Sequence, residues 1–351
     1  MYQKNKKNYV AWNILEEDFP RSSSLYNKLL FILNYAILSP SAHNTQPWLF
    51  EIKNGIIYFY IDNKRALVGS DESSRQLYES LGACLETIKV AGYYFGFEFD
   101  VSYQYNDKNK KDSDKELFCS LYAKECSIDT ENIYYKLFKN IIFRYSGKLK
   151  YENIEVDDKF LEEAGKLLFN FDDLNLKFVK VQGLDRNTIL SAIEEGTRRA
   201  FAMQSFKNEL GSWLRNNWTK KFDGMPGFTV GMPAPISLLA PKLFTLIDTS
   251  KMQISLMKDI VNSTPVIGLI SGVDCKENWI KSGQLYVLVS LLSCNYEFST
   301  HVMGAAVEFD DIAYQLSENL NINGKPLMFF RIGRQKKKFL SPRRLLTDVL
   351  I

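Results

Sequence analysis

The sequence predicts an α+β fold made of two similar halves, each with a mainly antiparallel sheet flanked by helices. In both halves, segments with apolar residues at helical spacing alternate with short β-rich runs. In the first half, Asn54-Gly55 separates two such runs, which is the strongest short signal for an antiparallel hairpin. The chain has 351 residues, enough for two domains. We place the boundary so that residues 1–140 form the first half and residues 141–351 the second.

The first half begins with a helix whose apolar face runs from Tyr26 to Ile37. Ser73 and Gln76 match a capping box, which predicts the start of a helix with apolar residues from Leu77 to Ala91. The other elements expected here are hairpin strands over 48–52 and 56–61, a strand over 98–105 and a solvent-exposed loop over 106–116.

The second half is expected to contain three strands and three helices. The strands are expected over 176–181, 264–271 and 325–332, and the helices over 157–169, 188–216 and 283–294. Between them, residues 220–242 hold three Gly and four Pro with little helical or strand period. A segment of this length without structure is usually a functional lid or a disordered tail. Its apolar side chains, such as Met225 and Phe228, favour a lid.

The composition is that of an ordinary globular protein, with 46% apolar and 24% charged residues. A net charge of +3 is too small to indicate a nucleic-acid partner. Five cysteines without a CxxC pair, and two histidines, argue against disulfides and zinc. No signal peptide and no apolar run of about 18 residues is found, so we expect a cytoplasmic protein without membrane partners.

A polar bend follows the first helix, where Pro40 ends the helix by removing a backbone donor. Ser41, Asn44 and Gln46 place hydroxyl and amide groups on this bend, and Pro47-Trp48 starts the next strand. Such a bend between two rigid elements is suited to holding a planar polar ligand. The alternative is an ordinary helix–strand loop with an Asn turn.

The order of residues in this loop, Ser-Pro-Ser-x-x-Asn-x-Gln-Pro-Trp-x-Phe, resembles the signature of the FMN-dependent nitroreductase family. The variant Ser-Ala-His-Asn-Thr-Gln-Pro-Trp-Leu-Phe is similar to the Acg branch, in which one chain mimics the two-subunit dimer. The resemblance implies a nitroreductase-like fold with one FMN between the halves, in a monomer. It also implies that Pro40, Ser41, Asn44 and Gln46 contact the cofactor; we call residues 39–48 the clasp loop.

Two basic motifs in the second half have the chemistry of a phosphate site. Arg144, Ser146 and Lys148 combine a guanidinium, a hydroxyl and an ammonium, although short basic runs are usually solvated surface. The motif resembles Arg-x-Ser-x-Lys of nitroreductases, which implies that Arg144 and Ser146 face the FMN phosphate and ribityl chain. Lys148 would then approach the flavin N1/O2 edge and tune its electronics.

The second motif is Ser-Pro-Arg-Arg-Leu-Leu near the C-terminus, inside a basic run that could otherwise be a solvated tail. It resembles the closing Pro-Arg-Arg-Pro-Leu of the family, which implies phosphate contacts from Arg343 and Arg344. No catalytic acid or base can be named. We expect His43 to shape the clasp loop and His301 to be structural. The family's Gly-rich turn near the flavin N5 is missing, because no Gly precedes Gly304 after the 283–294 helix.

Two functions fit these features. The first is an FMN-dependent oxidoreductase that takes electrons from NAD(P)H and reduces nitro or quinone-type acceptors. The second is a non-enzymatic protein that sequesters or stores FMN beneath the 220–242 lid. A nucleic-acid-binding protein is a poor third reading, since a phosphate site accounts for the basic residues.

Overall fold

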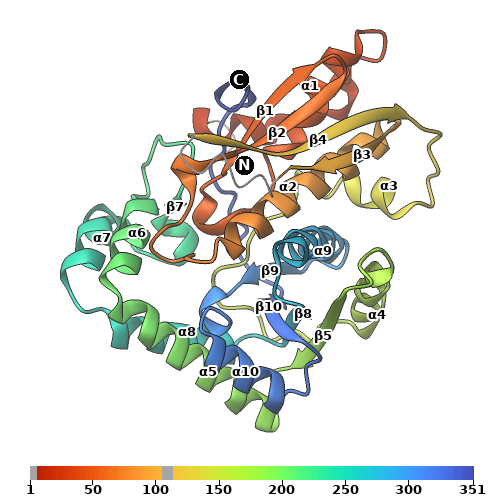
Figure 1. Cartoon of the computed structure of the whole chain (residues 1–351). Coiled ribbons are helices and arrows are strands. Elements are labelled where there is room, and N and C mark those ends of the chain that lie inside the picture. Colours follow the sequence, from red (N-terminus) through yellow and green to blue (C-terminus); the bar gives the residue numbers. More distant parts are fainter. Residues whose placement is uncertain (1–5, 105–113) are drawn as a thin grey trace.

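Two four-stranded antiparallel sheets form the framework of the protein, which confirms the predicted α+β class (Figure 1). The computed structural model describes residues 6–104 and 114–351. The first sheet has the order β1 (Trp48–Lys53), β2 (Ile56–Asp62), β4 (Lys115–Glu125), β3 (Phe97–Tyr103). The second has the order β5 (Leu174–Lys180), β8 (Val266–Gly272), β10 (Lys325–Gly333), β9 (Ser299–Val302).

Helices α2 (Arg75–Tyr94) and α9 (Lys276–Asn295) lie between the two sheets and join the halves (Figure 1). Their backbones are very close, because a Cβ built on Gly283 would lie 1.9 Å from the Glu79 carbonyl oxygen. A Cβ on Gly82 would lie 2.1 Å from the Ile280 carbonyl oxygen. One hydrophobic core includes residues of both helices and so joins the two halves, while two smaller clusters lie within the second half.

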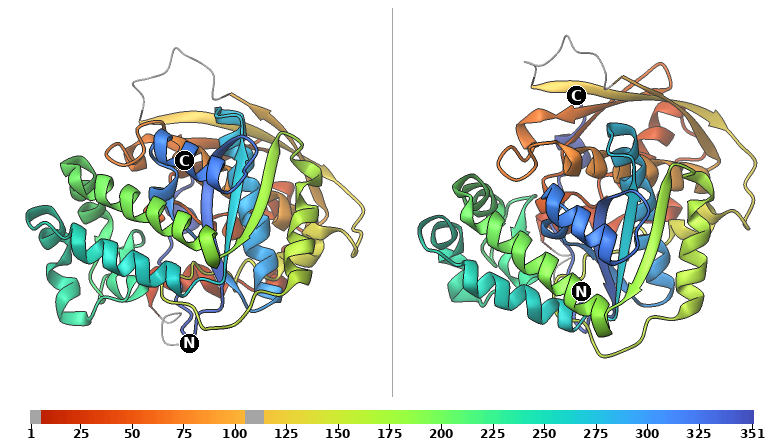
Figure 2. Two further views of the ribbon diagram at one scale, coloured as in Figure 1. Left: turned by 90° about the horizontal axis from the view of Figure 1, so that it is seen from below. Right: turned by 60° about the horizontal axis from the view of Figure 1, so that its bottom comes forward.

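Of the remaining helices, some pack beside α2 and α9, and others cover the far face of the second sheet. Four of them, α5 (Gly183–Ala202), α6 (Gln204–Trp213), α7 (Ala234–Leu246) and α8 (Ser250–Asn262), come from one stretch of the second half. They form a layer that extends to one side of the molecule (Figures 1 and 2). The others are α1 (Leu25–Ala36), α3 (Ile133–Phe138), α4 (Asp158–Lys166) and α10 (Asp310–Asn319).

Two predictions for this layer are wrong. The helix expected over 188–216 is broken at Met203, whose extended backbone (φ −82°, ψ 121°) separates α5 from α6. The segment 220–242 is also more regular than predicted, since α7 begins inside it at Ala234. Pro235 lies in the first turn of α7, where a missing N–H leaves no intrahelical hydrogen bond unmade.

The predicted capping box at the start of α2 is wrong as well. The two carboxylate oxygens of Asp71 accept hydrogen bonds from the backbone N–H groups of Gln76 (3.1 Å) and Leu77 (2.9 Å). Most of the solvent loop expected over 106–116 lies outside the described residues, and its last two residues belong to β4.

The C-terminal tail returns to the first half and covers the edge of its sheet. The backbone N–H of Phe50 in β1 donates to the Val349 carbonyl (2.7 Å), and that of Ile351 donates to the Phe50 carbonyl (2.9 Å). Further back, the Arg343 N–H donates to the carbonyl of Asn8 (3.0 Å). The tail therefore carries Arg343 and Arg344 of the second half to the clasp loop of the first.

Candidate functional site

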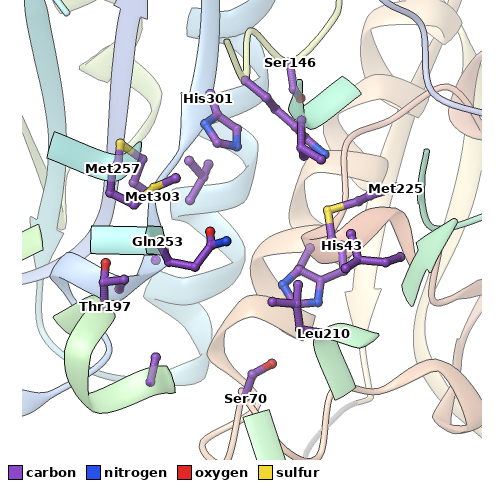
Figure 3. Close-up of a pocket in the computed structure, with 18 of the residues that line it drawn as sticks. His43, Ser70, Ser146, Thr197, Leu210, Met225, Gln253, Met257, His301 and Met303 are labelled. Carbon is purple, nitrogen blue, oxygen red and sulfur yellow. The ribbon is translucent and has the colours of Figure 1, made fainter. Parts of the chain in front are cut away.

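A cavity of about 960 Å³ lies where the clasp loop, the second sheet and the α5–α8 layer meet. Sites for a single small ligand or cofactor usually measure roughly 300–1,000 Å³, so this one is among the larger. Its wall takes residues from both halves of the chain, including Ser41 and His43 from the clasp loop and Lys148, His301 and Arg343 from the second half. Figure 3 shows side chains that approach the space from several sides.

The clasp loop has a strained backbone that tertiary contacts hold in place. His43, Asn44 and Gln46 all have positive φ angles, of 47°, 57° and 54°, a conformation that non-glycine residues rarely adopt. The Ser41 hydroxyl accepts a hydrogen bond from the Gln46 N–H (2.9 Å), and the Ser80 hydroxyl of α2 accepts one from the Ala42 N–H (3.1 Å). Pro40, Ser41 and Asn44 line the cavity.

The side chains of Asn44 and Gln46 bind neighbouring segments of the chain. The Asn44 amide donates to the carbonyls of Gly224 and Pro342, at 3.0 Å each, and its oxygen accepts from Arg343. The Gln46 amide donates to the Phe222 carbonyl (2.8 Å). These bonds tie the clasp loop to the 222–224 segment on one side and to the C-terminal tail on the other.

One end of the cavity is cationic. Lys148 and Arg343 line it, and their charges are close enough for Arg343 to lower the pKa of Lys148. Burial is the larger cause, and together they bring that pKa to about 8. Within residues 6–104 and 114–351, the Lys148 ammonium has no hydrogen-bond or ion-pair partner, and the Nε of Arg343 is buried without one. No carboxylate is among the groups that shift either pKa.

The other residues expected at the phosphate site are divided by the structure. Ser146 lines the cavity, whereas Gln46, Arg144 and Arg344 are not part of its wall. Arg144 is buried and donates to the Leu38 carbonyl (2.9 Å). Arg344 pairs with Asp62 (3.2 Å) and donates to the carbonyls of Gln46 and Asp348. Cofactor contacts by Gln46, Arg144 and Arg344 therefore stay predictions.

Both histidines of the chain line the cavity, His43 from the clasp loop and His301 from β9 (Figure 3). The Nδ1 atoms of both rings are buried and have no hydrogen-bond partner among the described residues. Burial, with a smaller contribution from Lys148, lowers the pKa of His43 to about 4, so its imidazole is neutral at physiological pH. We had predicted only structural roles for them, and a chain with just two histidines offers no sequence pattern that shows they share one cavity.

A pair of carboxyl groups lies on another part of the wall. Glu79 of α2 and Glu308 both line the cavity, and burial raises the pKa of each above the ordinary value. Arg75 lies between them, 3.1 Å from Glu308 and 3.9 Å from Glu79. This cluster links α2 of the first half to the loop after β9.

The part of the wall that α5–α8 supply, together with residues 225–233, is uncharged. It is rich in methionine, leucine, isoleucine and phenylalanine, with Gln253 and Thr197 as neutral polar members. In Figure 3, Gln253 extends into the space between the two sides of the cavity. The cavity therefore has a cationic end and a separate apolar region.

The residues of the cationic end fit an anionic cofactor such as FMN. The unpartnered Lys148 ammonium and the orphaned Arg343 Nε both lack a counter-charge, which a phosphate or another anionic group would provide. Ser146 and Ser41 add hydroxyl groups on the same wall. Among the described residues no group of His, Cys, Asp and Glu could hold a metal ion, and no helix is long and apolar enough to span a bilayer.

Comparisons with known proteins give one relative over nearly the whole chain. No family model matches it. The probable NAD(P)H nitroreductase PigM of Serratia sp. (strain ATCC 39006) is 22% identical over 340 residues, 91% of each chain. Two solved structures overlap loosely. The first is the FMN and NADPH-dependent nitroreductase NfnB from Sphigopyxis sp. strain HMH, which is 12% identical with a TM-score of 0.41; the match covers 61% of this chain and 96% of that one. The second is the FMN-dependent nitroreductase NfnB from Mycobacterium smegmatis, which is 13% identical with a TM-score of 0.39; the match covers 63% of this chain and 97% of that one. Over 91% of its length, the chain is thus similar in sequence to a protein described as a probable NAD(P)H nitroreductase.

Proposed function

We propose that this protein binds one FMN at the cationic end of the cavity and is an FMN-dependent oxidoreductase. Electrons would come from NAD(P)H and pass to nitro or quinone-type acceptors. The observation that carries the proposal is the convergence of Lys148, Ser146 and Arg343 with the clasp loop on one large cavity. The name of the Serratia relative supports the reaction class. A single chain that mimics a two-subunit nitroreductase, as in the Acg branch, belongs to the same proposal.

The chain's own residues would bind and polarise the cofactor. Arg343 and Ser146 would hold its anionic and hydroxyl groups, and Lys148 would place a positive charge beside the ring system. FMN, when bound, supplies the hydride chemistry. His43, being neutral above about pH 4, would be a hydrogen-bonding partner rather than a further cation.

The absorbance spectrum of the purified protein tests this proposal. We expect flavin bands at about one FMN per chain, bleaching on addition of NADPH and recovery when a quinone or nitroaromatic compound is added. A protein that neither contains FMN nor takes it up would overturn the proposal, as would two flavins per chain.

A storage function is the second candidate, and the hydrogen bonds between the clasp loop and residues 222–224 of the proposed lid support it. Asp223 pairs with Arg65 (3.0 Å) and Arg215 (2.8 Å), and Asn44 and Gln46 hold the carbonyls of Gly224 and Phe222. If these contacts block NAD(P)H, stopped-flow bleaching of the flavin band should be slow with NADPH but fast with dithionite. Replacing Asp223 with Ala should then speed the NADPH reaction. Fast reduction of the unaltered protein would favour the enzyme.

A further inference from the structure

The distribution of methionine marks a second ligand subsite in the cavity. The chain has eight methionines, and all seven that fall within the described residues line this one cavity. Five of the seven belong to the α5–α8 layer and the segment 225–233 that it encloses, and Figure 3 shows Met225 and Met257 on facing sides. Methionine side chains are flexible and polarisable, and their sulfur atoms make favourable contacts with aromatic rings. A wall so enriched in methionine fits apolar ligands that contain rings.

The same region lacks charge, and among the described residues its unpartnered polar groups include the Thr249 hydroxyl and the Gln253 amide. Gln253 is only 9% exposed, and within the described residues its side-chain amide makes no hydrogen bond. Figure 3 shows the amide pointing into the cavity from α8. Its oxygen and nitrogen are not among the fully buried atoms, so they are accessible from the cavity. A ligand with a neutral hydrogen-bonding group would satisfy it, whereas a charged ligand would find no counter-charge on this wall.

The mouth of this region is also apolar. Ile236 of α7 and Met252 of α8 line the cavity, yet they are 51% and 59% exposed, so they lie where it meets the surface. Exposed apolar patches of this kind mark binding grooves in proteins. The entrance, like the interior, therefore favours an uncharged, apolar ligand.

We propose that the α5–α8 region binds a neutral, mainly aromatic small molecule, and that Gln253 hydrogen-bonds the one polar group of that ligand. The methionine wall adapts to its ring system, and the cationic end stays available for FMN. That this molecule is the electron acceptor rests on the proposed function; the subsite itself does not.

Nile red, a neutral aromatic dye that fluoresces in apolar surroundings, serves as the first probe. We expect saturable binding at one site. Ile236→Asp should weaken it at least tenfold by placing a charge at the mouth. Leu238→Asp is the matched control, because Leu238 lies on the same helix, is 57% exposed and does not line the cavity. Ala200→Phe, which fills the interior, should also weaken binding. Equal losses at positions 236 and 238 would overturn the proposal, because the dye would then be bound to the exterior.

A second pair of probes tests the role of Gln253. The lactam 2-quinolinone and naphthalene have the same two-ring shape, but only the lactam offers a donor and an acceptor. In dye-displacement titrations we expect the unaltered protein to prefer the lactam by roughly tenfold, the usual size of one buried hydrogen bond. Gln253→Leu should abolish that preference, and an unchanged preference would overturn the assignment. FMN content, read at the flavin absorbance, is measured on every variant. Absence of FMN from the unaltered protein, with dye binding retained, would refute the proposed function alone.

Discussion

At the residue scale, Lys148 and Arg343 make one end of the cavity cationic, whereas the basic residue Arg144 is not part of its wall. The cofactor contacts predicted for Arg144, Ser146 and Lys148 come from the resemblance to Arg-x-Ser-x-Lys, and Ser146 and Lys148 line the cavity. Arg144 is turned toward the carbonyl of Leu38. Whether a basic side chain faces a ligand or a backbone carbonyl depends on packing against residues far away in the chain, which spacing does not encode.

Gln46 and Arg344 are two further residues whose contacts residue spacing does not encode. The resemblance predicts that both contact the cofactor, but each meets the other across the clasp loop, because the Arg344 backbone N–H donates to the Gln46 side chain at 2.8 Å. The contact joins positions nearly three hundred residues apart. A polar residue in a loop can therefore serve to close the fold, and no local pattern distinguishes that use from ligand binding.

Lys148 provides a prediction on pH. Its pKa of about 8 means that it is protonated near neutral pH and loses its charge as the pH rises through 8. Since an anionic cofactor favours the protonated ammonium, FMN affinity should fall between pH 7 and pH 9. Lys148→Met should weaken FMN binding at pH 7 by roughly tenfold or more, the worth of a charge-assisted hydrogen bond, and should remove most of the pH dependence. Fluorescence quenching of FMN gives the Kd.

The control for that experiment is Lys337→Met, because Lys337 is an exposed residue of the C-terminal basic run. Its affinity and pH profile should match those of the unaltered protein. If Lys148→Met kept the full pH dependence, another group would be responsible, and the placement of Lys148 at the cofactor would be wrong.

At the scale of elements, strands and long apolar helices were predictable because their periodicity is local. The strand expected over 325–332 is β10, and the helix expected over 283–294 lies within α9. The errors occur where a tertiary contact or a single backbone angle decides. Asp71 lies four residues before α2 and still caps it, and Met203 breaks a run that is otherwise continuous in helical character.

The close approach of α2 and α9 leads to a second prediction. Gly283→Ala should be strongly destabilising, by roughly 2 kcal/mol or more, because the added methyl group meets a backbone carbonyl that cannot move without separating the helices. Gly165→Ala in α4 is the matched control, since nothing lies within 4 Å of its Cβ position. There the change should be neutral or stabilising by up to about 1 kcal/mol. Urea unfolding of both variants measures the difference, and similar midpoints would contradict close helix packing.

At the scale of the whole molecule, the division into two halves predicted from the sequence describes the sheets but not the interior. Each sheet is formed within one half, while the core runs through α2 and α9 without interruption. The cavity and the C-terminal tail likewise combine both halves. Local periodicity predicted the other strands of the two sheets but missed β4 and β9, and it does not encode contacts between distant segments.

The tail provides the third prediction. Deleting residues 346–351 removes the buried side chains of Leu346 and Val349 and uncovers the edge of β1. Burial of two such side chains is worth roughly 3–6 kcal/mol, so the free energy of unfolding should fall by several kcal/mol. Weaker FMN binding should accompany it, because Arg344, the neighbour of Arg343, loses its hydrogen bond to the Asp348 carbonyl. Thr347→Ala, an exposed change in the same segment, is the control. An unaltered unfolding midpoint after the deletion would show that the tail is dispensable.

The returning tail also has a consequence for how the cell makes this protein. During synthesis, the first sheet leaves the ribosome long before residues 342–351 exist, with the edge of β1 open and the clasp loop without its arginine. An open strand edge invites pairing with other chains. Synthesis of residues 342–351 is therefore the step that both covers the edge of β1 and brings Arg343 to the clasp loop.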